Sequence, residues 1–247
     1  MALLTADQAA PPGDDDRPWP ADEASALLIQ DELRSRVVTR SLVDIGAQRL
    51  VAGLDVAYAK DESVVAGAVA VIDPAEDCRV VETATATRPV EFPYVPGLLA
   101  FREIPALLDA LARLARRPQV LVCDGYGVAH PRRFGLACHL GLLTALPTFG
   151  VAKTAFIGSF DEPGPERGDW APLTDGGEVI GRVLRTQPGV KPVFVSVGHL
   201  IGLDEATALA LRLAPRYRLP ETTRQADSLS RSALAAATAP DPVGGDS

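Results

Sequence analysis

Apolar positions recur along this chain with two different spacings, which predict two kinds of element. Continuous or alternating apolar positions predict β-strands over residues 50–58, 64–72, 79–87, 120–123, 147–151, 178–185 and 192–197. Spacings of three and four predict α-helices, one beginning after Asp22 and others over 98–116, 136–143, 204–213 and 222–236. Short connections join the first three strands, so these should form an antiparallel meander, whereas helices and strands alternate afterwards. The pattern therefore predicts a mixed α/β fold.

The two ends of the chain differ in composition from the rest. Both are rich in Ala, Pro, Gly and Asp and lack the apolar content that a folded segment needs. We therefore expect disordered tails at residues 1–22 and 236–247 around a single domain at 23–235. Of the net charge of −8, residues 1–23 carry −5 and residues 236–247 carry −2. The nearly neutral remainder can still present a basic face to nucleic acid, to which its scattered arginines would contribute.

Composition also narrows the setting in which the protein works. The chain has three cysteines, Cys78, Cys123 and Cys138. Their number is odd and no two of them have the CxxC or CxxxxC spacing of a metal site, so neither a disulfide framework nor a zinc site is predicted. No apolar run reaches the length of a membrane span, and the first residues lack the features of a signal peptide. We expect a cytoplasmic protein that has no membrane partner and acts as a monomer.

Two carboxylates lie within or directly after apolar strands. Asp55 interrupts the strand at 50–58, where a charge is costly to bury unless it is paired or coordinated. Asp124 ends the strand at 120–123 and precedes Gly125, at the strand-to-helix mouth where open α/β sheets bind their ligands. Judged from this loop alone, capping of the following helix explains Asp124 equally well.

Two further carboxylates fall in predicted helices. Glu103 lies beside an apolar helix face, although Pro105 is expected to bend or restart that helix. Asp227 taken alone would be a surface residue. If the four acids converge, they suit a hard cation such as Mg²⁺, which takes oxygen ligands. Such ions activate water and stabilise the leaving oxygen in phosphodiester hydrolysis.

Three other polar residues occupy positions where chemistry is plausible. Lys153 directly follows a predicted strand and can aim an ammonium at a phosphate, although most such lysines are surface residues. His130 lies in the loop after Asp124 and can donate a hydrogen bond to a phosphate or carboxylate. Tyr94 lies between two prolines in a loop that should be stiff and should display the ring, although such a tyrosine is more often a turn residue.

Several blocks of this sequence resemble the endonuclease V family of nucleases, which act at deaminated adenine. They occur in the family's order between about residue 25 and residue 235, and they read VAGLDVAY, RPVEFPYVPGLLAFREIPALL, LVCDGYGVAHPRRFGLACHLGLLTALPTFGVAKT, EPGPERGDW, VKPVFVSVGHLIGLDEA and YRLPETTRQAD. The resemblance implies an RNase H-like α/β fold. Its mixed five-stranded sheet would be flanked by helices, with the first three strands antiparallel.

The resemblance also implies catalytic roles for particular residues. Asp55 of VAGLD, Asp124 of VCDG and Glu103 of FRE would be metal ligands. Asp227 of RQAD would complete the cluster, at a position where the family has either His or Asp. The catalytic positions near the scissile phosphate would be filled by His130 of VAHP and Lys153 of VAKT.

A second group of residues would contact the substrate. Tyr94 matches the wedge loop that enters the duplex beside the altered base, where an aromatic ring can replace lost stacking. Backbone N–H groups in Gly-rich turns are candidate readers of the displaced base. With Tyr94, the predicted substrate-binding set comprises Pro93, Val95, Pro96, Gly97, Gly125, Gly127 and His199, which follows another predicted strand.

The activity implied by the resemblance is metal-dependent nicking of damaged DNA. The enzyme would use Mg²⁺, with Mn²⁺ as a substitute, and would cut the second phosphodiester bond 3′ to deoxyinosine, leaving a 3′-hydroxyl and a 5′-phosphate. Two alternatives stay open. One is a nuclease of the same fold acting mainly on inosine in RNA, and the other is a protein that binds altered nucleic acid without cutting it.

Overall fold

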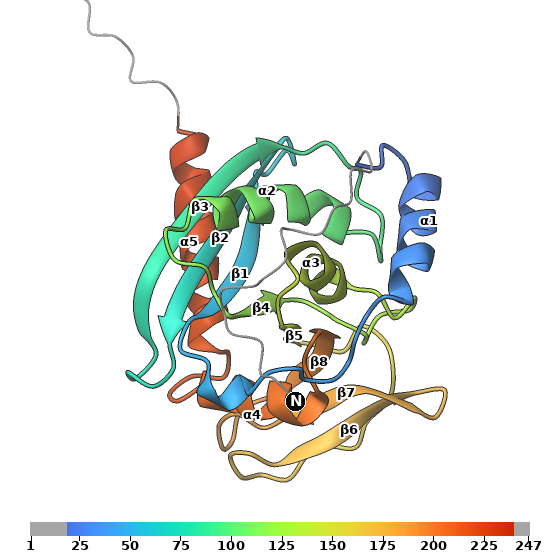
Figure 1. Cartoon of the computed structure of the whole chain (residues 1–247), viewed down its shortest axis with the longest axis vertical. Helices are drawn as coiled ribbons and strands as arrows, with labels where there is room; N and C mark the ends of the chain where they lie inside the picture. Colours follow the sequence, from blue (N-terminus) through green and yellow to red (C-terminus); the bar gives the residue numbers. More distant parts are fainter. Residues whose placement is uncertain (1–18, 240–247) are drawn as a thin grey trace, which may run out of the picture.

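A computed structural model describes residues 19–239, which form one mixed sheet with helices on both faces (Figure 1). The strands are β1 (Val51–Tyr58), β2 (Val64–Asp73), β3 (Arg79–Pro89), β4 (Val120–Asp124), β5 (Thr148–Ala152), β6 (Trp170–Asp175), β7 (Glu178–Leu184) and β8 (Val193–His199). The helices are α1 (Glu23–Arg34), α2 (Ala100–Ala112), α3 (Leu136–Thr144), α4 (Leu203–Arg212) and α5 (Glu221–Ala237), with a 3₁₀ turn, η1 (Ile45–Ala47).

The sheet has the order β3-β2-β1-β4-β5-β8-β7-β6. Strands β1 to β3 are antiparallel, as predicted, and β1, β4 and β5 run parallel to one another. The predicted kind of fold is confirmed, but the described residues form an eight-stranded sheet, whereas the family resemblance implied five strands and the apolar pattern predicted seven. Strand β6 lies in a stretch that reads as a loop, because Pro172 interrupts it. As an edge strand, β6 tolerates a residue that cannot donate a hydrogen bond.

The two faces of the sheet bury separate apolar cores. On one face, α2 and α3 pack against residues such as Leu54, Leu121 and Cys123. On the other face, α4 packs over Val122 and Val195. Helix α5 covers this second face beside β1 and β2, as Figure 1 shows behind the sheet. Its approach to β1 is so close that a Cβ at Gly53 would lie 2.1 Å from the Thr222 carbonyl carbon, so no larger residue fits there.

Helix α2 stays continuous through Pro105 and does not restart there. A proline inside a helix has no N–H to donate to the carbonyl four residues earlier, here that of Phe101. The indole Nε1 of Trp19 donates to this carbonyl oxygen at 2.9 Å and supplies the missing hydrogen bond. Trp19 also stacks on His139, with ring centroids 5.6 Å apart. The ordered domain therefore includes Trp19, which lies within the segment predicted as a tail.

We expect the Trp19→Ala substitution to lower the free energy of unfolding by about 2–3 kcal/mol, because it removes a partly buried ring and leaves the Phe101 carbonyl without its donor. The melting temperature should fall by roughly 4–10 °C. A matched control is Trp170→Ala, since Trp170 is 48% exposed on the edge strand. Equal losses for the two variants would contradict a structural role for Trp19. Removing residues 1–18 should be tolerated because that segment has no apolar pattern.

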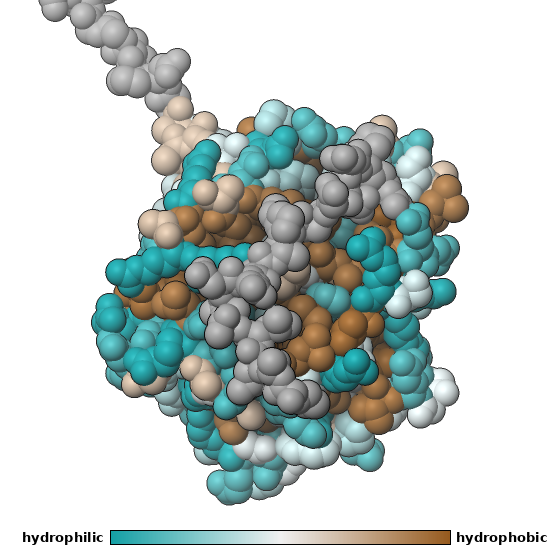
Figure 2. All heavy atoms as spheres, viewed as in Figure 1, coloured by the Kyte–Doolittle hydropathy of each residue, from teal (hydrophilic) through white to brown (hydrophobic). Residues whose placement is uncertain are grey.

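Other expectations concern the ends, the cysteines and the surface. Apart from residues 19–22 and 236–239, the predicted tails lie outside the described residues. All three cysteines are free and buried. Within residues 19–239, no helix is long and apolar enough to cross a membrane. In Figure 2, hydrophobic and hydrophilic side chains are interspersed on the part of the visible face that is coloured.

Candidate active site

Asp55 and Asp124 lie side by side on two neighbouring parallel strands, Asp124 at the carboxyl end of β4 and Asp55 within β1, directly after the last residue that pairs with β4. Leu54 in β1 pairs with Cys123 in β4, and each aspartate is the next residue in its strand. Because side chains alternate along a strand, Asp55 lies on the same sheet face as Gly53, which is the face that α5 covers. The register places Asp124 on that face as well. The fold therefore brings these two predicted residues together.

Lys153 approaches Asp124 from the third parallel strand. Val151 in β5 pairs with Asp124, and Lys153 follows two residues later, so that its Nζ donates to Asp124 Oδ2 at 2.8 Å. Partial burial disfavours the ammonium, but the hydrogen bond and the attraction of the nearby aspartates outweigh it and raise the pKa of Lys153. The backbone here is fixed by Arg218, which donates to the carbonyl oxygens of Lys153 at 2.6 Å and Pro192 at 2.8 Å. Lys153 is therefore a charged group held in place.

Glu103 reaches the same sheet edge from α2, on the opposite face. Its burial, together with repulsion from Asp55 and Asp124, raises the pKa of its carboxyl to about 8. Burial and repulsion from Asp124 similarly raise the pKa of Asp55 to about 7. Carboxylates that cluster in this way disfavour one another's ionisation, and such clusters are characteristic of functional sites where a bound cation or proton offsets the negative charge.

Asp227 belongs to α5 and has a partner of its own. Its Oδ1 accepts hydrogen bonds from Nη2 and Nε of Arg231, at 2.7 and 3.1 Å, and it also repels Asp55. Asp227 lies within the electrostatic field of the cluster but is already paired. Among residues 19–239, no three acids, histidines or cysteines lie close enough together to enclose a metal ion. The carboxylates share an edge without forming a closed cage.

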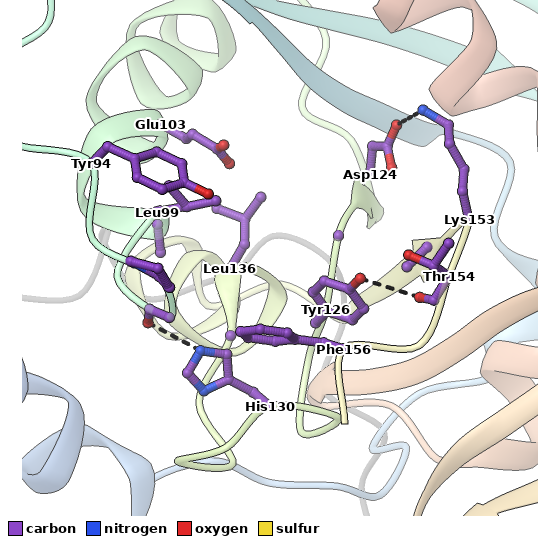
Figure 3. Close-up of a pocket in the computed structure, with 16 residues that line it drawn as sticks. Tyr94, Leu99, Glu103, Asp124, Tyr126, His130, Leu136, Lys153, Thr154 and Phe156 are labelled. Carbon is purple, nitrogen blue, oxygen red and sulfur yellow. Dashed lines mark hydrogen bonds and ion pairs between the residues drawn. The ribbon is translucent and has the colours of Figure 1, made fainter. Parts of the chain in front are cut away.

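A cavity of about 360 Å³ opens beside these carboxylates (Figure 3). Figure 3 shows Glu103 and Tyr94 on one side of it and the Asp124–Lys153 pair on the other. Three rings line the cavity below them. The Tyr126 ring lies 5.3 Å and the His130 ring 5.5 Å from the ring of Phe156, centroid to centroid. The cavity thus combines a largely aromatic floor with a charged rim.

The predicted wedge loop forms one wall of this cavity. Phe92 and Leu98 are buried and anchor the two ends of the loop, while Tyr94 is 62% exposed between them. The guanidinium of the buried Arg102 lies 5.8 Å from the Tyr94 ring centroid. Of the other loop residues predicted to bind substrate, Pro96 and Gly97 line the cavity, whereas Pro93 and Val95 do not.

His130 lines the cavity, and its ring is held by bonds within the protein. The ring is buried, and both of its nitrogens already have partners: Nε2 bonds to the Gly97 carbonyl oxygen at 3.0 Å, and Nδ1 accepts from the Arg132 N–H at 3.2 Å. Burial lowers the pKa of His130 to about 4, so the ring is neutral and Nε2 carries the proton. His130 therefore ties the wedge loop to the segment after β4.

Two further predicted substrate contacts lie away from the cavity. His199 ends β8, which runs antiparallel to β5, so it pairs with Thr148 at the far end of the sheet. There its Nδ1 accepts from the Val38 N–H. The Gly127 N–H is buried and donates to Ser196 Oγ at 2.8 Å, so this N–H is not free to donate a hydrogen bond to a base. Gly125, by contrast, does line the cavity.

Tyr126 and Phe156 are aromatic cavity residues that were not predicted from the sequence. The Tyr126 hydroxyl donates to the Thr154 carbonyl oxygen at 3.2 Å, which joins the segments after β4 and β5. Phe156 is 40% exposed. The signal available in the sequence was position: Tyr126 comes two residues after Asp124, and Phe156 three residues after Lys153.

A family model described as Endonuclease V matches residues 31–228. Endonuclease V of Streptomyces avermitilis is 58% identical to the chain, covering 90% of it and 96% of that protein. A crystal structure of endonuclease V from that organism, also 58% identical with the same coverage, gives a TM-score of 0.86. The crystal structure of the catalytic domain of human endonuclease V gives a TM-score of 0.81 at 34% identity, and the match covers 87% of this chain and 96% of that one. A Ciona intestinalis endonuclease V was solved with a 24mer DNA containing an inosine followed by a ribo-adenosine. It gives a TM-score of 0.77 at 29% identity, and the match covers 87% of this chain and 98% of that one. The chain therefore belongs to the endonuclease V family.

Proposed function

We propose that this protein is a metal-dependent endonuclease that nicks DNA at the second phosphodiester bond 3′ to deoxyinosine, leaving a 3′-hydroxyl and a 5′-phosphate. The observation that carries the proposal is the placement of Asp55 and Asp124 side by side on adjacent strands, where the pairing of β1 with β4 ends, with Asp124 lining a cavity that has an aromatic floor. The Ciona intestinalis relative was solved with inosine-containing DNA, which supports the choice of lesion.

The donor set fits a magnesium ion, with manganese as a substitute. Mg²⁺ retains several water ligands and is usually held by one or two carboxylates together with substrate phosphates, so a closed protein cage is not required. Asp55 and Asp124 would be its principal ligands and Glu103 would be a third. Asp227, already paired with Arg231, would contribute less. When bound, the ion would supply charge neutralisation and activation of water.

The protein's own groups would then position the reacting phosphate. Lys153 is held at the sheet edge by its backbone contact with Arg218, and its ammonium can donate to a non-bridging phosphate oxygen. In the reaction a water oxygen bonds to phosphorus, the bond from phosphorus to O3′ breaks, and O3′ leaves as a hydroxyl after taking up a proton. Lys153 would stabilise the negative charge that builds up on the phosphate oxygens.

The cavity offers a place for the altered base. Its rings, Tyr126 and Phe156, can stack on a base that has left the duplex. Backbone groups of Gly97 and Gly125 line the same space and are candidates for hydrogen bonds to the base edge. Tyr94 stands exposed at the rim, where its ring can occupy the gap left in the stack.

We expect Tyr94→Ala to reduce discrimination between inosine-containing and undamaged duplex about tenfold, because stacking on an aromatic ring contributes about 1–3 kcal/mol per base. The defect should shrink on single-stranded inosine substrates, where less unstacking is needed. Single-turnover cleavage of both substrates measures it, and Tyr94→Phe, which keeps the ring, serves as the control. An equal defect on the two substrates would mean that Tyr94 acts only in loop packing.

The experiment that tests the proposed function compares matched DNA and RNA strands, each carrying one inosine, with and without Mg²⁺. Preferential nicking of the DNA strand in Mg²⁺ supports the proposal. The alternative, an endoribonuclease acting on inosine in RNA, is favoured by one observation: the DNA bound to the Ciona intestinalis relative has a ribo-adenosine directly after the inosine. Faster cutting of the RNA strand would establish that alternative. Binding without cutting of either strand would contradict both.

A further inference from the structure

A second hollow, of about 400 Å³, lies on the α5 side of the sheet edge. Asp124 and Lys153 line it, and both also line the cavity with the aromatic floor. The two hollows therefore meet at the proposed reaction centre, one on each side of it. The remaining walls come from α5 and the segment before it, through Leu219, Thr223, Arg224, Asp227, Ser228 and Arg231. We call this hollow the α5 groove.

Cationic and hydroxyl side chains follow one face of α5 along this groove. Arg224, Ser228 and Arg231 are spaced by four and three residues, which places them on the same helix face. They cover about 10 Å of helix, which is the length of about three nucleotides of a B-form strand. The groove thus presents three hydrogen-bond donors on one helix face, together with Lys153 and the acids Asp124 and Asp227.

The two arginines are exposed enough to meet a ligand. The Arg231 side chain is 71% exposed while it pairs with Asp227, and its charge offsets that of the acid. The Arg224 side chain is 32% exposed, its guanidinium lies 3.9 Å from the Tyr217 ring centroid, and its contact to Glu221 is long at 3.9 Å. Planar guanidinium groups bind phosphate through paired hydrogen bonds, and phosphates receive half or more of the hydrogen bonds in protein–DNA interfaces. The groove is therefore suited to a phosphate backbone.

We propose that the α5 groove binds the phosphate backbone of the substrate strand on the 3′ side of the cut, with Arg224 and Arg231 as phosphate ligands. This inference rests on the proposed function. If the altered base occupies the cavity with the aromatic floor, and the cut lies 3′ to that base at the sheet edge, the strand beyond the cut continues into the hollow on the other side. The groove then also holds the new 5′-phosphate end after cleavage.

The test combines a charge-removing substitution with shortened substrates. Binding of inosine-containing single strands is measured by fluorescence anisotropy in EDTA, so that cutting does not interfere. One substrate has long flanks on both sides, a second ends one nucleotide after the scissile bond, and a third lacks the 5′ flank. The variants are Arg231→Gln and Arg224→Gln. The control is Arg79→Gln, because Arg79 is also exposed and paired with a nearby acid, Glu76, but lies on β3.

We expect each groove variant to bind the long-flanked substrate roughly three- to tenfold more weakly. The slope of the logarithm of the binding constant against the logarithm of salt concentration should fall in magnitude by about 1, which corresponds to the loss of one phosphate contact. The loss should persist without the 5′ flank and disappear without the 3′ flank. Arg79→Gln should bind like wild type, and thermal melting shows whether the variants are folded. A loss that survives removal of the 3′ flank, or no loss in either groove variant, would overturn the assignment. If the wild-type protein cuts inosine-containing strands and neither substitution changes binding, the role of the groove is refuted and the proposed function stands. If the wild-type protein neither binds nor cuts these strands, the proposed function itself is refuted.

Discussion

Replacing Asp124 by Asn is expected to slow nicking of inosine-containing DNA by about 10³-fold or more, while binding of that DNA stays within about threefold of wild type. The substitution keeps the shape of the side chain but removes its charge at the point where β4 ends. It also removes the negative charge that pairs with Lys153, whose Nζ lies 2.8 Å from Asp124 Oδ2. The free ammonium should then favour phosphate binding, which is why affinity should survive the loss of rate.

Single-turnover nicking and anisotropy binding on the same substrate separate these two effects. Asp55→Asn should behave similarly, whereas Asp227→Asn should have a smaller effect because Asp227 is already neutralised by Arg231. Asp109→Asn is a suitable control, since Asp109 lies in the same helix as Glu103 but pairs with Arg88. Nearly normal nicking by Asp124→Asn at ordinary Mg²⁺ concentrations would remove Asp124 from the proposed metal site.

The parts of the fold that could be predicted are those with a local periodic signal. Strands β1 and β4 are apolar runs, each with one aspartate that breaks the pattern, and both aspartates lie at the sheet edge. The cap of α1 was also readable, because the Asp22 side chain accepts a hydrogen bond from the Ser25 N–H, as a capping residue should.

The parts that were missed depend on contacts between distant segments. Nothing near Pro105 in the sequence indicates that Trp19 supplies the hydrogen bond that keeps α2 continuous. Strand β6 exists because β7 pairs with it, and its own sequence has no strand pattern. In each case a tertiary contact overrides the local preference of the chain.

Site residues follow the same division. The aspartates were recognisable because a carboxylate in an apolar strand needs a reason to be there. His199 follows a strand just as Asp124 does, but the sequence does not show that β8 runs antiparallel to β5 and ends at the opposite edge. His130 looks available in sequence, yet both of its ring nitrogens are used inside the protein. Which polar atoms remain free is decided only by the packed structure.

Activity at low Mg²⁺ is expected to rise about 10²-fold between pH 6 and pH 8.5. Burial and mutual repulsion raise the pKa of Asp55 to about 7 and that of Glu103 to about 8. Both groups are therefore mostly protonated at pH 6, and a protonated carboxyl is a poor ligand for a cation. Raising the Mg²⁺ concentration should shift the pH profile to lower pH, because the cation competes with the protons. A profile that does not respond to Mg²⁺ would contradict this coupling.

The same shifts predict the opposite trend for stability without metal. Because the folded-state pKa of each acid lies above its unfolded value, the folded protein binds more protons between about pH 4 and pH 8, and stability falls as pH rises through that range. The buried histidines act in the other direction at acid pH, since burial lowers the pKa of His130 to about 4 and of His139 to about 3. Wild type and a variant lacking one acid contain the same histidines. The histidine contribution therefore cancels when their free energies of unfolding are compared at the same pH.

Glu103→Gln should therefore be more stable than wild type in EDTA at pH 8.5, by on the order of 2 kcal/mol or roughly 4–8 °C in melting temperature. The advantage should shrink at pH 5.5, where Glu103 is protonated in the folded protein. It should also shrink at pH 8.5 when Mg²⁺ is added, because a bound cation relieves the repulsion in wild type. Glu178→Gln is the control, since Glu178 is exposed and paired with Arg133. Equal melting temperatures for wild type and Glu103→Gln at pH 8.5 in EDTA would show that the carboxylates do not destabilise the fold, and the pH dependence of cutting would then need another origin.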